Sequence, residues 1–413
     1  MPVRESGVLE QMTESKSVNR KRHCMVVHNH YPRGETRVQR EAEALVRHGY
    51  EVDLLCLRGK TEIATEVCNG VRVIRLPVRY RNYGWVGGKF LEYLRFLLLA
   101  MVKLAQLHLQ RPYGTVQLHN LPDFLVFAAW VPRLSGAGVI LDLHDLMPEF
   151  YRARFTGDGN SLPVRLLYLQ EKLACRFADH VITVSEHWRR DLIERGVPAH
   201  KCSVVMNVAD DNVFRPLRDG RPRWPDDSDL RMIYHGTLVD RYGLDVAIRA
   251  VDQVRDDCPN IHLTILGRGS HVPTLARLIQ ELDLGQHVVL REEIRPVEEL
   301  PAIIGAADIG IVPYRDDVFT DALLPTKLME YAALGLPAIA ARTTAIEACF
   351  SGTMVEFFEP GDVDDLARCI RLLYNDSERL AELREGSEKF NQRYSWPRIS
   401  AEYVALVDRL GSW

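Results

Sequence analysis

The segment LLPTKLMEYAALGLPAIA, residues 323–340, predicts a short helix followed by a short buried strand. Thr326 is suited to cap the helix, Gly335 stands where a left-handed residue ends it, and Pro337 follows just beyond. The run PAIAA then predicts a strand packed inside a sheet. The apolar side of the expected helix comprises Leu328, Met329, Ala332 and Ala333.

Lys327 and Glu330 are the only charged residues of this segment. They are three residues apart, so they share one face of the helix near its N-terminus. Unpaired N–H groups and the positive end of the helix dipole lie there, so this face could hold an anion on Lys327 and a polyol on Glu330. The alternative interpretation is an exposed ion pair, which is the commoner role of an isolated Lys/Glu pair.

Composition places the chain among ordinary globular enzymes. It has 413 residues, of which 46% are hydrophobic and 26% charged, and a formal net charge of −4. This length allows two domains with separate cores, and the mixed, slightly acidic charge argues against nucleic-acid binding. The eight cysteines form no C-x-x-C pair, which favours reduced thiols and a cytoplasmic protein over disulfides or a zinc site.

The sequence contains no expected membrane span. Residues 1–22 are polar and are expected to form a flexible tail rather than a secretory signal. The longest apolar run, FLLLAMV at 96–102, is far shorter than the roughly 20 residues that a bilayer requires. The helix expected at 88–110 is apolar nearly all round, so it is either buried or in peripheral contact with a membrane surface.

Short β-rich runs alternate with helical stretches from residue 23 onward, which predicts parallel sheets covered on both faces. The pattern stops in a segment rich in proline and charge and then starts afresh, so two doubly wound domains are expected. Ligands are expected in the cleft between them. The predicted organisation is a tail at 1–22, a first domain at 23–209, a linker at 210–229, a second domain at 230–395 and a closing helix at 396–413.

Polar residues follow several strands of the first domain. Arg37 and Arg40 enter the helix after the first strand, where an anion could bind or where both could face solvent. Further candidates at strand ends are His119, Asp142, His144, Asp145 and Glu149. Their position favours a cleft location, and their spacing does not match a recognised zinc site, so no metal is expected.

In the second domain, Gly236 and Thr237 allow a tight turn after the first strand, and Arg241 follows. Gly267 and Gly269 form a G-x-G after the next strand. The third glycine and the acidic residue of a dinucleotide site are missing, so no nicotinamide cofactor is expected. Arg241 and Lys327 together could neutralise a diphosphate without a metal.

Several segments in a common order resemble one known family. HGTLVDRYGLDVAIRAV, LTILGRGS, AADIGIVPYRDD and LPTKLMEYAALGLPAIA resemble the nucleotide-binding domain of the retaining glycosyltransferases of family GT4. YPRGETRVQREAEALVRHGYEV, LHNLPDF, LDLHDLMPEF and VITVSEHWRRDLIERGVP resemble its acceptor-binding half. The resemblance implies the GT-B fold, with two facing Rossmann-like domains and an interdomain cleft. It assigns acceptor binding to 23–209 and nucleotide-sugar binding to 230–395, and it implies that the closing helix at 396–413 packs back on the N-terminal domain.

The resemblance also implies roles for individual residues. Glu330 matches the glutamate that holds the ribose, and His144 matches a histidine near the donor sugar. Arg241 matches one member of a phosphate-binding basic pair whose second member is Tyr242 here. The catalytic candidates are therefore His144, Arg241 and Lys327. The nucleotide-sugar candidates are Gly34, Gly236, Thr237, Gly267, Gly269, Leu324, Pro325, Thr326 and Glu330, and the acceptor-side candidates are His119, Asp145 and Glu149.

One departure concerns the donor sugar. The first glutamate of the family motif would stand at Ala322, with Asp321 one place away. The expected function is metal-independent, retaining transfer from a nucleoside-diphosphate sugar, a UDP- or GDP-sugar, to a glycan or lipid-linked acceptor at the cytoplasmic face of a membrane or in the cytoplasm. A sugar-nucleotide epimerase and a catalytically silent binding subunit are the alternatives.

Overall fold

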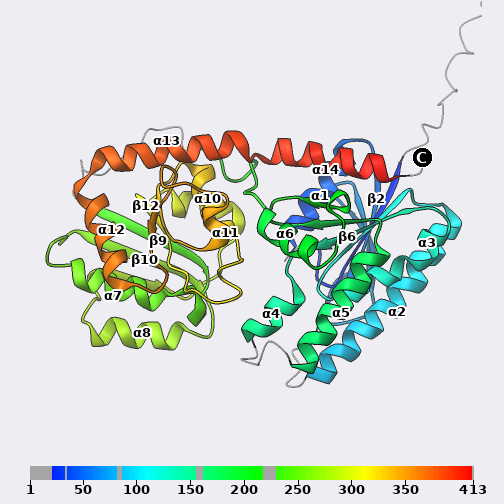
Figure 1. The fold of residues 1–413 in the computed structure, drawn as a ribbon, viewed down its shortest axis with the longest axis horizontal. Coiled ribbons are helices and arrows are strands. Elements are labelled where there is room, and N and C mark those ends of the chain that lie inside the picture. The colour runs from blue at the N-terminus through cyan, green and yellow to red at the C-terminus, as the bar shows by residue number, and fades with distance from the viewer. Residues whose placement is uncertain (1–20, 33–34, 81–85, 155–160, 217–228, 412–413) are drawn as a thin grey trace, which may run out of the picture.

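The computed structural model describes residues 21–32, 35–80, 86–154, 161–216 and 229–411. Figure 1 shows two α/β lobes next to each other, with two helices of the C-terminal region running along one edge of both. Each lobe contains one sheet with helices against it. This is the GT-B arrangement of two doubly wound domains that the sequence predicts.

The first lobe is built on an eight-stranded sheet in the order β3-β4-β2-β1-β5-β6-β7-β8. Among these strands β3 alone runs antiparallel, in a hairpin with β4 that is not predicted by the sequence pattern. Most of these strands are buried along nearly their whole length because helices cover both faces. The strands are β1 (Arg22–Val27), β2 (Glu51–Leu57), β3 (Thr65–Cys68), β4 (Val71–Leu76), β5 (Thr115–His119), β6 (Gly138–Leu143), β7 (His180–Thr183) and β8 (Cys202–Val204).

The long helix expected at 88–110 is present as α2. Residues 123–134 form a 3-10 helix, η1, followed by a short α-helix, α3. The helical elements are α1 (Thr36–Arg47), α2 (Val86–Gln110), η1 (Asp123–Ala129), α3 (Trp130–Leu134), α4 (Met147–Arg154), α5 (Leu162–Phe177), α6 (Glu186–Glu194) and η2 (Ala199–Lys201).

The second lobe has a six-stranded parallel sheet in the order β11-β10-β9-β12-β13-β14. Its strands are β9 (Leu230–Thr237), β10 (Ile261–Arg268), β11 (Val288–Arg291), β12 (Ile309–Val312), β13 (Ala338–Ala341) and β14 (Glu356–Phe358). Its helical elements are η3 (Asp240–Tyr242), α7 (Leu244–Val254), α8 (Val272–Glu281), η4 (Val297–Glu299), α9 (Leu300–Ile304), α10 (Thr326–Leu334), α11 (Thr344–Glu347) and α12 (Val363–Asn375).

Strand order reverses between β1 and β5 in the first sheet and between β9 and β12 in the second. The carboxyl ends of such strands are where open α/β sheets bind ligands. His119 ends β5, and His235 lies near the end of β9. The topology therefore directs attention to these two strand ends.

The last two helices connect the lobes. In Figure 1, α13 (Ser377–Arg393) lies along the second lobe and α14 (Trp396–Leu410) along the first. The Arg40 guanidinium lies 5.0 Å from the centre of the Trp396 ring, and the Tyr403 hydroxyl donates to the Gln117 side chain at 2.6 Å. The closing helix is thus bound to the interior of the first lobe.

Packing of α13 depends on a glycine. A Cβ at Gly386 would lie 1.9 Å from the carbonyl oxygen of Thr353. Alanine would gain up to about 1 kcal/mol of helix propensity, but overpacking costs about 1–3 kcal/mol. We expect Gly386→Ala to lower the free energy of unfolding by about 1–2 kcal/mol in urea denaturation. Gly285→Ala is the control, since its Cβ would meet nothing within 4 Å; equal stability of the two variants would contradict this account.

Candidate functional site

Glu330 is held by a histidine at the end of β9. A Glu330 carboxylate oxygen lies 2.5 Å from Nε2 of His235. The other ring nitrogen of His235 lies 3.2 Å from the Tyr331 hydroxyl, which donates to the carbonyl oxygen of Ile233 at 3.1 Å. The glutamate remains 18% exposed while the histidine is nearly buried. It is therefore oriented from below and keeps an accessible side for a ligand.

Lys327 is buried among aromatic rings. Its Nζ donates to the Tyr314 hydroxyl at 2.7 Å and lies 4.9–5.1 Å from the ring centres of Tyr234, Tyr242 and Tyr314. Within the described part of the chain it has no carboxylate at ion-pair distance. Burial lowers the pKa of Lys327 to about 8, although Glu330 partly opposes this. The interpretation of Lys327 and Glu330 as an exposed ion pair is therefore wrong.

Glycines bring backbone close to this lysine. Gly236 has φ +124, and a Cβ there would come within 3.4 Å of the Lys327 side chain. Gly267 has φ +152, and a Cβ there would collide with the Gly236 carbonyl oxygen at 1.7 Å. A Cβ at Gly269 would lie 1.9 Å from the carbonyl oxygen of Leu238. Both members of the G-x-G are thus required by close packing beside Gly236, and Thr237 is exposed at the end of β9.

The start of α10 differs from the expectation in one detail. Pro325 is the N-cap residue, and no side chain caps the helix, so the predicted capping by Thr326 is wrong. Thr326 is the first helical residue and is exposed, whereas Leu324 and Pro325 are buried. Gly335 ends the helix with φ +73, as predicted. The N-terminal turn therefore keeps N–H groups that no side chain caps.

Arg241 belongs to η3, next to the boundary between the lobes. Its guanidinium lies 5.3 Å from the ring centre of Phe319, and that ring meets Phe150 of α4 edge-on at 5.9 Å. Phe150 belongs to the first lobe, so these contacts bridge the two lobes. Tyr242, in the place of the family's second basic residue, stacks on Tyr314 at 4.6 Å.

The missing glutamate of the family motif is not replaced by its neighbour. Ala322 is 6% exposed. The Asp321 carboxylate accepts a hydrogen bond of 2.7 Å from the backbone N–H of Thr344 at the start of α11. Asp321 therefore serves as a cap for α11, and its carboxylate is committed to that helix.

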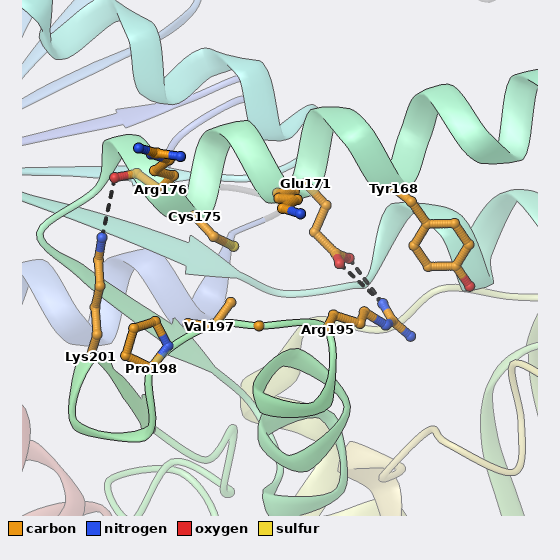
Figure 2. Close-up of a pocket in the computed structure, with 10 residues that line it drawn as sticks. Tyr168, Glu171, Cys175, Arg176, Arg195, Val197, Pro198 and Lys201 are labelled. Carbon is orange, nitrogen blue, oxygen red and sulfur yellow. Dashed lines mark hydrogen bonds and ion pairs between the residues drawn. The ribbon is translucent and has the colours of Figure 1, made fainter.

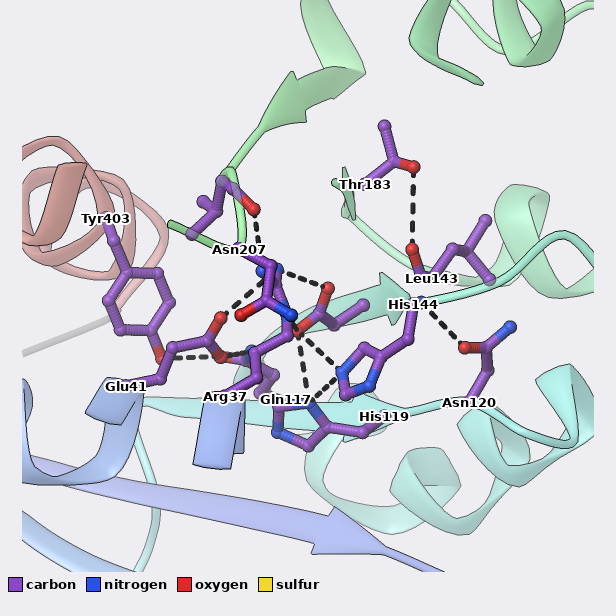
Figure 3. A network of polar contacts seen from close by, with 12 residues as sticks. Arg37, Glu41, Gln117, His119, Asn120, Leu143, His144, Thr183, Asn207 and Tyr403 are labelled. Carbon is purple, nitrogen blue, oxygen red and sulfur yellow. Dashed lines mark hydrogen bonds and ion pairs between the residues drawn. The ribbon is translucent and has the colours of Figure 1, made fainter. Parts of the chain in front are cut away.

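Two histidines and an aspartate converge at the ends of β5 and β6 (Figure 3). An Asp142 carboxylate oxygen lies 3.1 Å from Nδ1 of His119 and 3.3 Å from Nε2 of His144. The same two nitrogens lie 3.1 Å apart. The His144 backbone N–H donates to the Asn120 side chain at 2.7 Å. His119 and Asp142 are fully buried, whereas the His144 side chain is 18% exposed, so His144 presents the accessible edge of this group.

Arg37 neutralises Asp142 from inside the lobe. Its Nε and Nη2 donate to the two oxygens of Asp142 at 3.1 and 2.9 Å. The same Nη2 lies 3.1 Å from a carboxylate oxygen of Glu41. Burial opposes the charge of Asp142, but Arg37 and His144 outweigh it and hold the pKa of Asp142 well below its usual range. Burial likewise opposes protonation of His144, yet Asp142 raises the pKa of His144 overall. Asp142 thus stabilises the protonated imidazole against the cost of its burial.

The expectation that Arg37 and Arg40 lie at an anion site or in solvent is wrong. Both are buried, and their side chains bond within the protein. Arg37 donates to the carbonyl oxygen of Val205 at 2.6 Å, and Arg40 donates to the carbonyl oxygen of Val208 and to the Asn207 side chain. These bonds tie α1 to the segment that follows β8.

A polar chain connects α14 to this centre (Figure 3). The Tyr403 hydroxyl donates to Gln117, whose amide nitrogen donates to Glu41 at 2.8 Å and to Asp142 at 3.3 Å. Sequence reasoning missed Gln117 and Tyr403 because neither stands at a strand end or in a motif. Their partners lie far away in the chain, so no local pattern marks them.

The remaining candidates of the first domain are Asp145, Glu149 and Gly34, and they do not all lie with the histidines. Asp145 is adjacent to His144, and burial raises the pKa of its carboxyl to about 6. Burial is also the main reason that the pKa of Tyr242 is raised, with Asp145 adding to it across the lobe boundary. Glu149 is separate from the histidines, because it pairs with Arg195. Gly34 lies outside the described residues.

A metal ion would find three ligand atoms close together at His119, Asp142 and His144. However, both oxygens of Asp142 already accept hydrogen bonds from Arg37. A second cluster comprises Asp240, Asp245 and His271, of which Asp245 pairs with Arg315. Neither group is a ligand set free of internal partners.

Comparison with solved structures agrees with the fold. Sucrose-phosphate synthase from Thermosynechococcus elongatus superimposes with a TM-score of 0.75 at 19% identity, covering 95% of this chain and 99% of that one. Anabaena HepE in complex with UDP gives a TM-score of 0.68 at 16% identity, covering 94% and 100%. At these identities the likeness concerns the fold, which is that of a GT-B protein.

Family models match both lobes. A glycosyl transferase 4-like domain matches residues 34–207, and a glycosyl transferases group 1 domain matches residues 229–376. The chain belongs to the group 1, GT4-type glycosyltransferases, as its motifs indicate.

Curated relatives match over about half of their length. A GDP-mannose-dependent phosphatidylinositol monomannoside mannosyltransferase of Mycolicibacterium smegmatis is 30% identical over 214 residues, 49% of this chain and 55% of that protein. The amylovoran biosynthesis glycosyltransferase AmsK of Erwinia amylovora is 27% identical over 228 residues, 53% and 54% respectively.

The buried Lys327 predicts a conflict between stability and function. Its folded pKa of about 8 is below the usual 10.5, so the unfolded chain binds this proton more tightly. Burial of the charged lysine therefore lowers the free energy of unfolding by about 3 kcal/mol below pH 8, and this loss disappears as the pH rises toward 10.5. Lys327→Met removes this cost, but it also leaves the Tyr314 hydroxyl without its hydrogen-bond donor. We therefore expect the free energy of unfolding at pH 7 to rise by about 1 kcal/mol in this variant.

The matched control is Lys389→Met, an exposed helical lysine whose replacement should change the free energy of unfolding by less than about 0.5 kcal/mol. Urea denaturation without ligand, at pH 7 and pH 9.5, measures both variants. A loss of stability in Lys327→Met at pH 7 would show that the lysine stabilises the fold and is not held there against a cost.

Proposed function

We propose that this protein is a metal-independent, retaining glycosyltransferase that moves a sugar from a nucleoside-diphosphate sugar to a hydroxyl group of a glycan or lipid-linked acceptor. Polysaccharide or glycoconjugate biosynthesis is its proposed setting. The observation that carries the proposal is Lys327, a buried cation without a carboxylate partner among the described residues, one turn from a glutamate oriented by His235. A diphosphate is bound by a cation and ribose hydroxyls by a carboxylate, and these two groups lie on consecutive positions of one face of α10.

Donor binding would use the second lobe. The Glu330 carboxylate would accept hydrogen bonds from the ribose hydroxyls, and the uncapped first turn of α10 would meet the diphosphate with Lys327 and Arg241. A diphosphate would raise the pKa of Lys327 and so bind most tightly below pH 8, where the lysine is charged. The donor is proposed to be a UDP- or GDP-sugar, and the names of the relatives include a GDP-mannose-dependent enzyme.

The chemistry requires stabilisation of the leaving diphosphate and a bound acceptor. Arg241 and Lys327 would stabilise the developing charge on the phosphate. His144, held by Asp142, would contact the donor sugar from the first lobe, with Asp145 and His119 on the acceptor side. The departing phosphate would accept the proton of the acceptor hydroxyl on the same face of the sugar, which preserves the anomeric configuration.

The first test is nucleotide binding. The panel comprises UDP, GDP, ADP, TDP and CDP. We expect UDP or GDP to raise the melting temperature of the protein, and we expect the same rise whether EDTA or magnesium is present. At about 100 times the dissociation constant a ligand adds roughly 2.7 kcal/mol. Glu330→Gln should weaken this binding about tenfold to hundredfold by calorimetry, since it loses charged hydrogen bonds.

Glu281→Gln is the matched control, an exposed glutamate of α8 that should bind as the wild type does. Binding of none of the five nucleotides would defeat the proposal. Strict dependence on magnesium would remove its metal-independent part.

The second test separates donor binding from turnover. His144→Gln should reduce nucleoside-diphosphate release from the selected donor by about a hundredfold while leaving nucleotide affinity unchanged. His187→Gln, on α6, is the control and should retain full activity. Nuclear magnetic resonance of the product should show a retained anomeric configuration. An epimerised sugar with free nucleoside diphosphate would favour the epimerase, and nucleotide binding without any turnover would favour a silent subunit.

A further inference from the structure

The first lobe carries an exposed apolar surface on three helices. On α5, Leu162, Leu166, Leu169 and Leu173 recur at helical spacing and are 49–69% exposed. The exposed apolar side chains of α2 are Phe90, Leu91, Leu94, Leu98, Val102 and Leu109, and those of α3 are Trp130 and Leu134. We call these side chains the leucine face. Of the two sequence interpretations of α2, burial applies only to its opposite side, with Phe96 and Leu104, which is in the core.

These helices form one continuous surface. Both α2 and α5 contact η1 through aromatic side chains: Phe90 meets Phe124, and Phe177 meets Phe127 edge-on at 5.1 Å. Trp130 of α3 stacks on Phe177 at 5.6 Å. In Figure 1, α2 and α5 are neighbours at the side of the first lobe. A patch of this extent on a globular protein marks a binding surface.

The charges on the same helices are one-sided. Their two carboxylates, Glu92 and Glu171, are buried. Several cations have no carboxylate partner within the described ranges: Arg95, Lys103, Arg165, Lys172 and Arg176. Of these, Arg95, Arg165, Lys172 and Arg176 are exposed, and Lys103 is partly exposed. The exposed carboxylate of Asp179, just after α5, pairs with Arg133 of α3. An apolar face whose own helices carry exposed cations and no exposed carboxylate among the described residues complements a surface that is apolar inside and negative outside.

Figure 2 shows a pocket between α5 and the chain that follows α6. It has a volume of about 490 Å³ and is lined by α5 and by the segment from Arg195 to Lys201. Lys172 and Arg176 line it from α5, while Arg195 is neutralised by Glu171 and Glu149. Leu173 is the next residue after Lys172, and Leu169 lies one helical turn before it; both leucines belong to the leucine face. The pocket thus offers cations directly next to apolar side chains.

We infer that the leucine face docks on an anionic phospholipid bilayer, with Lys172 and Arg176 contacting lipid phosphates at the pocket. No helix among the described residues is long and apolar enough to cross a membrane, so the contact is peripheral. This lobe also carries His144, so docking would bring the proposed acceptor site to a lipid-linked acceptor. Only that last consequence rests on the proposed function, because docking itself requires no donor.

Vesicle sedimentation with the full chain and no nucleotide tests the inference. Binding is expected to vesicles of phosphatidylcholine with 30% phosphatidylglycerol and to be much weaker with phosphatidylcholine alone. Leu166→Glu/Leu169→Glu should reduce binding about tenfold or more. Lys172→Glu/Arg176→Glu should reduce it about thirtyfold, with a weaker salt dependence.

Ile294→Glu is the matched control, because Ile294 is 75% exposed on the second lobe and should leave vesicle binding unchanged. Urea denaturation of every variant without nucleotide reports folding and keeps this test separate from the proposed function. Absence of binding to anionic vesicles, or equal binding by the leucine variants, would overturn the inference. A dimer in light scattering that the leucine variants abolish would also overturn it, since a second copy would then cover this face.

Discussion

The buried ion pair between Arg37 and Asp142 organises the first lobe. Asp142 lies at the end of β6 with no exposed surface, where an unpaired charge would cost several kcal/mol. Arg37 satisfies both of its oxygens and also bonds to the backbone after β8. With this charge neutralised, Asp142 can hold His119 and His144 at the strand ends. The position of His144 therefore depends on a pairing made inside the protein.

The same network explains why the closing helix is part of the site. Tyr403 of α14 reaches Gln117, which contacts Asp142 and Glu41. Because α14 follows α13 of the second lobe, the packing of the two lobes is coupled to the group that holds His144. A shift of α14 would leave Gln117 with an unsatisfied buried oxygen, which is unfavourable. The two lobes are thus linked by polar contacts in addition to chain connectivity.

The two halves of the candidate site use opposite electrostatic solutions. On the first lobe, burial opposes protonation of His144, but the neighbouring Asp142 raises the pKa of His144 overall. On the second lobe, the Lys327 ammonium lies among tyrosine rings and donates to the Tyr314 hydroxyl, and burial lowers its pKa. Such a cation is costly without a ligand and gains most when an anion arrives. The diphosphate of the proposed donor would supply this anion to Lys327.

The sequence by itself determined the two α/β series and the helix at α10 with its Gly335 end, because periodicity and glycine are local signals. The roles of Glu330 and His144 came from the resemblance of their motifs to a known family and stay proposals. Tertiary structure alone decided that Arg37 is buried, that Asp321 caps α11, that His235 orients Glu330 and that three tyrosines surround Lys327. These features arise from contacts between residues distant in the chain, which no local pattern encodes. The sequence likewise did not decide whether the leucine face is exposed, since a helix that is apolar nearly all round has the same pattern whether one or both of its sides are buried.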